Sequence, residues 1–249
     1  ADQGSVLLHN DTESGFKDRY LIADAVRLGG GLGSVSRGTG KPPNAGPTSL
    51  RPRWEESCRT YAQFAGAPAT VYDASSSDPS DDVGCRSRFA AWEHEGGEDA
   101  IYLSWHTNAP SPARGTSTYV YGPNEPNGEY QFTGTKGSDA FGKLIQTHMV
   151  KDIKALWDPN WKDRGVYTAW FGEINPAHNN EMPAALVEAA FHSTLEDADQ
   201  LRQPRFRHLL ARSLYKAIAQ YFSDRDKVPL LLLPEPPEAL RLLATGAGK

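Results

Sequence analysis

Two residues with the chemistry of a hydrolytic site stand near the ends of apolar segments. His106 follows residues 101–105, and Glu188 lies within residues 184–191. In an open α/β sheet, reactive groups collect just beyond the carboxyl ends of the strands. Imidazole is a common metal ligand, and a carboxylate can act as a general base. This pair therefore predicts a metal ion and its general base at one edge of a sheet.

Each of the two residues also has a structural interpretation. His106 could be a strand-end residue held by a hydrogen bond, and Glu188 could be a buried salt-bridge partner. An unpaired carboxylate in an apolar strand is unfavourable, so the second interpretation requires a nearby cation. The sequence leaves both interpretations open beside the metal-site hypothesis.

Strand-like segments must position both residues. Ile101, Leu103 and Trp105 alternate with Tyr102 and Ser104, and the run ends at residues 108–110, Asn-Ala-Pro. This alternation predicts a buried strand with a polar tip. Residues 184–191 are almost continuously apolar and predict a second strand, with its one carboxylate near the end.

Helical and strand patterns alternate along the rest of the chain. The first predicted helix begins near Pro52, where Glu55 and Glu56 favour a helix amino end through the dipole. Ser138 is predicted to cap another helix. The predicted helices cover residues 52–65, 86–95, 139–156 and 204–222, and the further strands cover residues 69–72, 115–122 and 165–171.

This alternation predicts an α/β fold, a mainly parallel twisted sheet with helices on both faces, preceded by a small β-rich remnant. The remnant covers residues 1–36 and a linker rich in Gly, Pro and Ser covers residues 37–51. The α/β domain covers residues 52–224, and a Pro-rich, extended segment covers residues 225–249. The acidic, serine-rich residues 73–82 within the domain are predicted to be a surface loop.

The composition bounds the possible partners. The chain has 249 residues, 39% of them hydrophobic, which is enough to bury a proper core, and its formal net charge is −5. That charge argues against a nucleic-acid backbone or an anionic membrane surface as the main partner. No apolar run approaches the roughly 18 residues of a membrane span. The two cysteines, Cys58 and Cys85, fit either one disulfide or two small buried hydrophobes.

Several motifs resemble a known family. Residues 104–109, Ser-Trp-His-Thr-Asn-Ala, are similar to Ser-Ile-His-x-Asn-Ala of the zinc-dependent N-acetylmuramoyl-L-alanine amidase catalytic domain. Residues 183–191 resemble its Pro-x-x-Leu-x-Glu-x-x-Phe motif. Residues 86–91 resemble its Arg-x-x-x-Ala helix, and residues 115–121 resemble the glycine-to-aromatic strand that follows. The motifs occur in the family's order and spacing, from about Pro52 to Phe222.

The resemblance implies a zinc ion held by His, Glu and His, with a separate glutamate as the general base. The second histidine ligand corresponds to His106 and the base to Glu188. The glutamate ligand corresponds to Glu55 or Glu56. Glu55 is favoured because it leaves Cys58, Ala62 and Ala65 on the buried helix face. Plain carboxylates at a helix amino end are the alternative for this pair.

The family's first histidine follows an Asp-x-Gly-His-Gly-Gly motif, which this sequence lacks, so that ligand is expected before residue 1. Asn108, in the histidine motif, is expected to contact substrate. His178, just before the Glu188 strand, fits either a substrate contact or a turn residue. The implied substrate is peptidoglycan, cleaved between muramic acid and the stem peptide, and the implied location is secreted, periplasmic or at the cell envelope.

The flanks resemble other modules. Residues 5–36 are similar to the last strands of a golvesin-like β-sandwich, and residues 234–249 to the opening of a fibronectin type III domain. Such modules also fit a second hypothesis, a catalytically inactive wall-binding or developmental surface module with the amidase fold. A zinc carboxypeptidase on a related sheet is a third.

Overall fold

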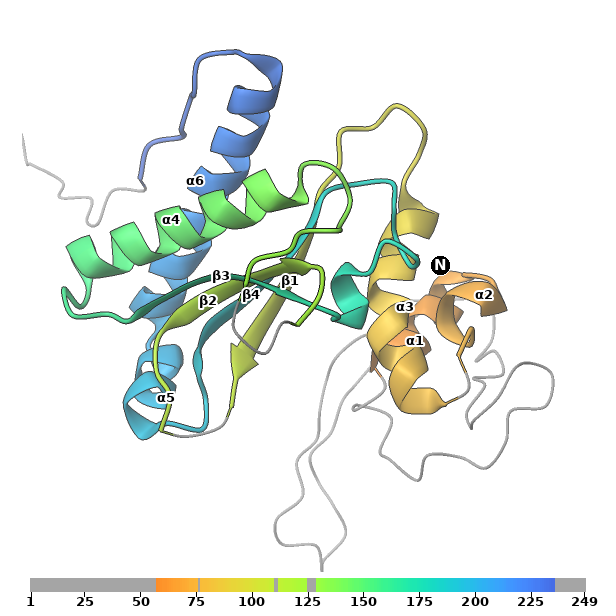
Figure 1. Ribbon diagram of the computed structural model, residues 1–249, viewed down its shortest axis with the longest axis horizontal. Helices are drawn as coiled ribbons and strands as arrows, with labels where there is room; N and C mark the ends of the chain where they lie inside the picture. Colours follow the sequence, from red (N-terminus) through yellow and green to blue (C-terminus); the bar gives the residue numbers. More distant parts are fainter. Residues whose placement is uncertain (1–56, 76, 110–111, 125–128, 236–249) are drawn as a thin grey trace, which may run out of the picture. The chain divides into compact units, whose positions relative to one another are not determined.

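A computed structural model describes residues 57–75, 77–109, 112–124 and 129–235 (Figure 1). Its helices are α1 (Ser57–Ala65), α2 (Ala69–Tyr72), α3 (Asp78–Glu93), α4 (Ser138–Leu156), α5 (Leu195–Arg202) and α6 (Pro204–Asp226), with a 3-10 turn η2 (Gly172–Ile174). Its strands are β1 (Tyr102–Asn108), β2 (Thr116–Tyr121), β3 (Asp163–Ala169) and β4 (Ala184–Phe191).

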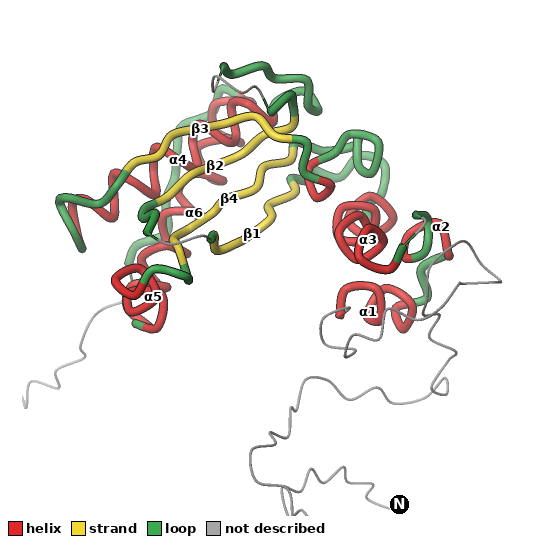
Figure 2. The backbone as a smooth tube through the Cα atoms, turned by 60° about the horizontal axis from the view of Figure 1, so that its bottom comes forward, coloured by secondary structure: helices red, strands yellow, loops and turns green. Residues whose placement is uncertain are grey.

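The four strands form one twisted sheet in the order β1-β4-β2-β3 (Figure 2). β1 runs parallel to β4 and β2 parallel to β3, while β2 and β4 are antiparallel. Two of the three pairings in the described part of the chain are therefore parallel. The fold is α/β with a mixed sheet and helices on both sides, which confirms the predicted fold class.

The main core lies between the sheet and helices α4 and α6, which cover one of its faces (Figure 1). β4 is buried along its whole length, because it lies between two neighbouring strands with helices behind it. Four fully buried side chains of this core lie on the inner stripe of α4, at helical spacing. They are Phe141, Ile145, Met149 and Ile153.

Two local predictions around this core are wrong. Ser138 does not cap α4, because the cap is Gly137, whose φ of +91° lies in the left-handed region that glycine tolerates. The Ser138 hydroxyl instead accepts a hydrogen bond from the Ala184 N–H at 2.8 Å. β1 is not a buried strand, because it is an edge strand among the described residues and its Trp105 is 43% exposed.

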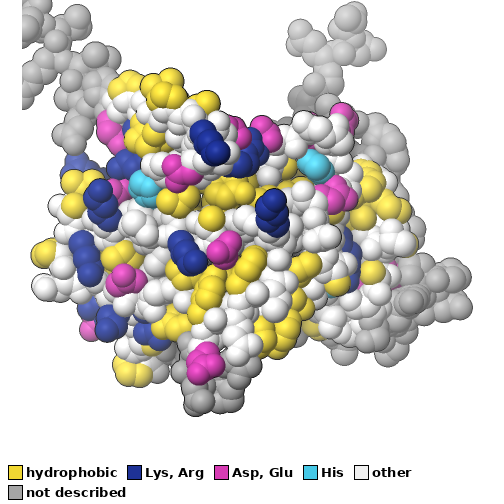
Figure 3. Space-filling model, turned by 45° about the horizontal axis from the view of Figure 1, so that its top comes forward, with side chains coloured by type: hydrophobic (Ala, Val, Ile, Leu, Met, Phe, Trp, Pro, Cys, Tyr) yellow, Lys and Arg dark blue, Asp and Glu magenta, His cyan; other side chains and the backbone are white. Residues whose placement is uncertain are grey.

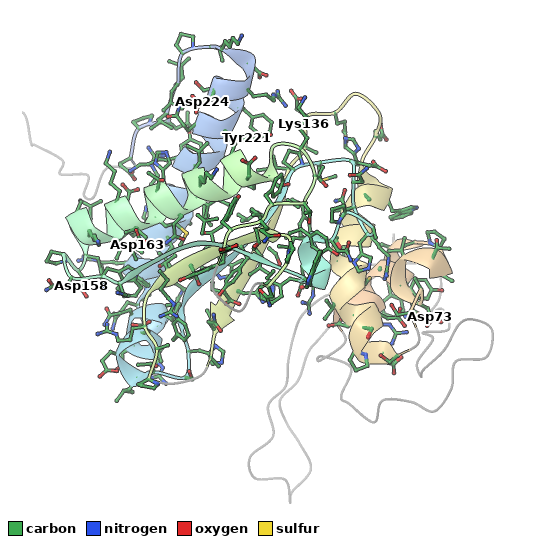
Figure 4. All side chains as sticks on the ribbon, in the orientation of Figure 1. Asp73, Lys136, Asp158, Asp163, Tyr221 and Asp224 are labelled. Atoms are coloured by element: carbon green, nitrogen blue, oxygen red, sulfur yellow. The ribbon has the colours of Figure 1, made fainter. Side chains whose placement is uncertain are left out.

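Helices α1, α2 and α3 differ most from the prediction. Residues 69–72 form a helix and not a strand, and residues 73–82 are not a surface loop, because α3 begins at Asp78. Three of these acidic residues are buried around Arg59, which is 1% exposed (Asp73 is marked in Figure 4). Arg59 forms an ion pair with Asp73 at 3.4 Å and with Asp78, and lies 4.0 Å from Asp81. A buried ion cluster has the composition of a solvated loop, which explains the error.

The buried face of α1 agrees with the predicted one in part. Ala62 is fully buried with Cys58 packed beside it, whereas Ala65 is exposed. Cys58 and Cys85 are both free thiols in one small apolar cluster. In this structure the two cysteines therefore act as two small hydrophobes and do not form a disulfide.

Several predictions fall outside the described residues. These include the β-rich remnant at residues 1–36, the linker at residues 37–51, and both Glu55 and Glu56. α6 continues to Asp226, two residues beyond the predicted domain end, and residues 228–235 contain no helix or strand. Within the described ranges, no helix is long and apolar enough to cross a membrane. On the face shown in Figure 3, apolar side chains alternate with charges of both signs.

Candidate active site

The two residues predicted to form the site lie side by side. The parallel register pairs His106 of β1 with Glu188 of β4. Alternation along each strand places both on the sheet face opposite the main core, since Leu103 and Val187 belong to that core. His106 is half-buried and Glu188 is 8% exposed. The sequence therefore identified two neighbouring groups on one sheet face.

A third residue, Glu173 of η2, completes a group of charged side chains that the sequence did not reveal. Its Oε1 lies 3.6 Å from His106 Nε2 and accepts a hydrogen bond from Arg86 Nη1 at 3.1 Å. Arg86 also donates from Nη2 to Asp82 at 2.8 Å. Glu173 stands in an irregular segment and meets Arg86 across 87 residues of sequence, so no local pattern indicates it.

The surroundings of Glu188 favour its protonated form more than water does. Burial raises the pKa of Glu188 to about 7, and the negative charge of Glu173 adds to the shift. Glu188 has no cationic partner among the described residues, so its salt-bridge interpretation has no support there. A general base works best when its pKa lies near the working pH. Near neutral pH this carboxyl can both take and return a proton.

His106 is held as a neutral imidazole. Burial lowers the pKa of His106, with Arg86 acting in the same direction and Glu173 opposing it. Its Nε2 forms a 3.0 Å hydrogen bond with Ser104 Oγ, the contact expected of a strand-end histidine. The neutral imidazole is also the form that binds metals. Both interpretations of His106 therefore have a physical basis.

The described residues do not by themselves make a zinc site. None of them form a group of three or more His, Cys, Asp or Glu side chains that could hold a metal ion. His106 and Glu173 approach each other, but a structural or catalytic zinc ion takes three or four protein ligands. Glu55 and Glu56, the predicted glutamate ligands, lie outside the described residues.

The two predicted substrate contacts have different environments. Asn108 ends β1 at the tip of the strand, half-buried, and its Oδ1 accepts a hydrogen bond from the Ala109 N–H at 2.7 Å. His178 lies in a turn, where its Nδ1 bonds the Gly172 carbonyl at 2.7 Å. Burial lowers the pKa of His178. His178 therefore secures the segment that carries Glu173, as its turn-residue alternative requires, and its contact with substrate stays a prediction.

Comparisons with known proteins agree on one family. A family profile described as N-acetylmuramoyl-L-alanine amidase matches residues 61–220. The germination-specific N-acetylmuramoyl-L-alanine amidase of Bacillus subtilis (strain 168) is 26% identical over 134 residues, which cover 53% of this chain and 48% of that protein. The amidase LytC of the same strain is 28% identical over 124 residues, covering 49% of this chain and 21% of that protein. The chain spans about half or less of the length of these relatives.

Solved structures of similar description also match. An N-acetylmuramoyl-L-alanine amidase from Clostridium difficile 630 is 18% identical, with a TM-score of 0.43 over 78% of this chain and 94% of that chain. AmiC2 of Nostoc punctiforme is 17% identical, with a TM-score of 0.41 over 67% of this chain and 78% of that chain. At these scores the structural likeness adds nothing to what the profile match shows.

Proposed function

The chain belongs to the N-acetylmuramoyl-L-alanine amidase family, and on that premise we propose that it hydrolyses peptidoglycan. The bond cleaved would be the amide between the lactyl group of muramic acid and the L-alanine of the stem peptide. The observation that carries this proposal is the pairing of His106 with a buried Glu188 whose pKa is raised to about 7. A general base with such a pKa contributes about 10²–10⁴-fold to a hydrolysis.

In this proposal Glu188 moves the proton of the reaction. Its carboxylate takes a proton from the water that attacks the amide carbonyl, as the new C–O bond forms. It then gives that proton to the leaving nitrogen of L-alanine, as the C–N bond breaks. Burial, together with the negative charge of Glu173, keeps the pKa of Glu188 high enough for the second transfer.

We propose zinc dependence from the family resemblance, with His106 and Glu55 or Glu56 as ligands. The described residues supply His106 alone of these, so the chain's own metal binding is the test. Inductively coupled plasma mass spectrometry of the full-length protein, which would include the histidine ligand expected before residue 1, is expected to find about one zinc per molecule. The His106→Ala variant should lose that metal. Equal zinc in both proteins would contradict the assignment of His106.

The activity itself is tested with N-acetylmuramoyl-L-alanyl-D-isoglutamine. Hydrolysis at the proposed bond yields N-acetylmuramic acid and the dipeptide L-alanyl-D-isoglutamine, which mass spectrometry distinguishes. Release of a free amino acid instead would favour the carboxypeptidase alternative. We further propose that the chain acts at the cell envelope, where this substrate lies, and that residues 1–36 and 234–249 belong to golvesin-like and fibronectin type III-like modules.

The second candidate function is an inactive wall-binding module with the amidase fold, since modules on both flanks would suit binding as well as catalysis. Such a module would bind insoluble peptidoglycan without releasing product, and Glu188→Gln would leave its binding unchanged. Product release that depends on Glu188 would rule this candidate out.

A further inference from the structure

Ser117 lies directly across the sheet from Glu188. The antiparallel register of β2 and β4 pairs the two residues, so their side chains leave the sheet on the same face. Cross-strand partners of this kind have Cβ atoms about 5 Å apart. A hydroxyl and a carboxylate span that separation by rotating about their side-chain bonds.

Both residues bury a polar atom that has no partner. Ser117 is fully buried, and its Oγ has no hydrogen-bond partner among the described residues. The same holds for Oε2 of Glu188, which is itself 8% exposed. A buried polar atom without a hydrogen bond is destabilising, so native proteins rarely retain one. Two such atoms on paired residues indicate that the two side chains are hydrogen-bond partners.

The other hydroxyls of β2 show that Ser117 is the exception. Thr116 Oγ1 donates to the Ala189 carbonyl at 2.8 Å, and Thr118 Oγ1 donates to Gln146 Oε1 at 2.9 Å. On its other side Ser117 pairs with Gly165, which has no side chain to offer. Glu188 is therefore the polar side chain that the register places beside this hydroxyl.

We propose that Ser117 is a positioning residue, whose hydroxyl donates a hydrogen bond to Oε2 of the Glu188 carboxylate. Oε2 is the oxygen without accessible surface, so this bond leaves Oε1 to face the reacting water. A serine hydroxyl rotates and can also accept a hydrogen bond from the protonated acid. Ser117 thus holds the base in one orientation through both proton transfers. This inference rests on the proposed function for its catalytic consequence, but the hydrogen bond itself does not.

The first test measures the bond without using activity. A double-mutant cycle of Ser117→Ala and Glu188→Met, in which methionine has a similar length but no comparable hydrogen-bonding group, is followed by urea unfolding of the full chain. Because contacting residues couple, we expect an interaction of at least about threefold in the folding equilibrium constant. Additive effects of the two substitutions would overturn the proposal, whether or not the chain proves to be an amidase.

The second test separates positioning from a merely structural role. Ser117→Ala should lower kcat for N-acetylmuramoyl-L-alanyl-D-isoglutamine about tenfold, as expected for a lost hydrogen bond to a charged group, with KM unchanged. Ser117→Thr keeps the hydroxyl and should restore most of kcat.

The matched control is Thr118→Ala, which removes a bonded hydroxyl from the next residue of β2 and should lower the melting temperature while leaving kcat unchanged. An unchanged kcat in Ser117→Ala, or an equal loss in the control, would overturn the positioning role. A wild-type chain without turnover would refute the proposed function instead, and the cycle would still decide the hydrogen bond.

Discussion

The core between the sheet and helices α4 and α6 consists of apolar side chains, whereas α1, α2 and α3 enclose buried charges. Phe141, Ile145 and Phe206 are fully buried in the first region. In the second, Arg59 is enclosed by carboxylates, and burial together with the charge of Asp81 raises the pKa of Asp73 to about 6. Apolar burial tolerates small changes in geometry, while a buried ion cluster depends on each partner. The two regions should therefore respond differently to substitution.

The largest effect is expected at Arg59. Arg59→Met removes the charge that neutralises Asp73 and Asp78 while keeping a long side chain. Because the carboxylates then stay buried without this cation, we expect a loss of about 3–5 kcal/mol in the free energy of unfolding. Urea denaturation followed by circular dichroism measures it. A loss below about 1 kcal/mol would show that the cluster is not what holds α1 to α3.

The apolar region provides the matched comparison. Ile145→Ala removes a fully buried side chain from α4, and we expect a loss of about 2–4 kcal/mol from lost burial and the resulting cavity. The same denaturation experiment applies. Unlike the Arg59 variant, this loss should change little between pH 5 and pH 8, because Ile145 belongs to a cluster of apolar side chains. A strong pH dependence would contradict the apolar description of this core.

These two regions also explain what the sequence could predict. The strands at residues 102–108 and 184–191 and the helices α4 and α6 were predicted because apolar patterns report burial directly. Residues 73–82 were misread because serine and aspartate are typical of loops, and the buried Arg59 cluster has no periodic pattern. Residues 69–72, Ala-Thr-Val-Tyr, were misread because β-branched and aromatic side chains favour strands. Helix α5 was not predicted at all, since its surface is mostly polar.

The candidate site divides in the same way. His106 and Glu188 stand at the tips of recognisable strands, and a family motif surrounds each of them. Glu173 carries no such signal, because it meets His106 from η2. Ser117 lies in a predicted strand, but its place beside Glu188 follows only from the register across the sheet. Sequence patterns therefore found the strands and missed the contacts that only tertiary structure brings together.

Substitution of the buried Glu188 in the sheet should have a smaller effect on the free energy of unfolding, and this effect should depend on pH. The pKa of Glu188 is raised from 4.5 to about 7 on folding, so the folded chain binds this proton more tightly than the unfolded chain does. Wild type should therefore match Glu188→Gln in stability below about pH 4.5 and fall behind it as pH rises to 7 and above. At pH 8 we expect the free energy of unfolding of Glu188→Gln to exceed that of wild type by about 1–2 kcal/mol. This is less than the whole pKa shift would give, because solvent screens part of the charge. Parallel stability curves for the two proteins would contradict the raised pKa.

The smallest effect is expected for an exposed ion pair. Arg202 and Asp199 on α5 form the same kind of contact as Arg59 with Asp73, at 2.7 Å, but both side chains are more than half exposed. Arg202→Ala should change the free energy of unfolding by less than about 0.5 kcal/mol, since solvent screens the pair. A loss comparable with that of Arg59→Met would show that burial is not what distinguishes the two regions.

The most direct test of the whole account is the turnover of N-acetylmuramoyl-L-alanyl-D-isoglutamine by wild type and Glu188→Gln, followed by mass spectrometry of L-alanyl-D-isoglutamine. Glutamine keeps the shape of the side chain and removes its basicity. If Glu188 is the base at the tip of β4, kcat falls by about 100-fold or more. Turnover by the variant within about threefold of wild type would contradict the central claim that this carboxylate moves the proton.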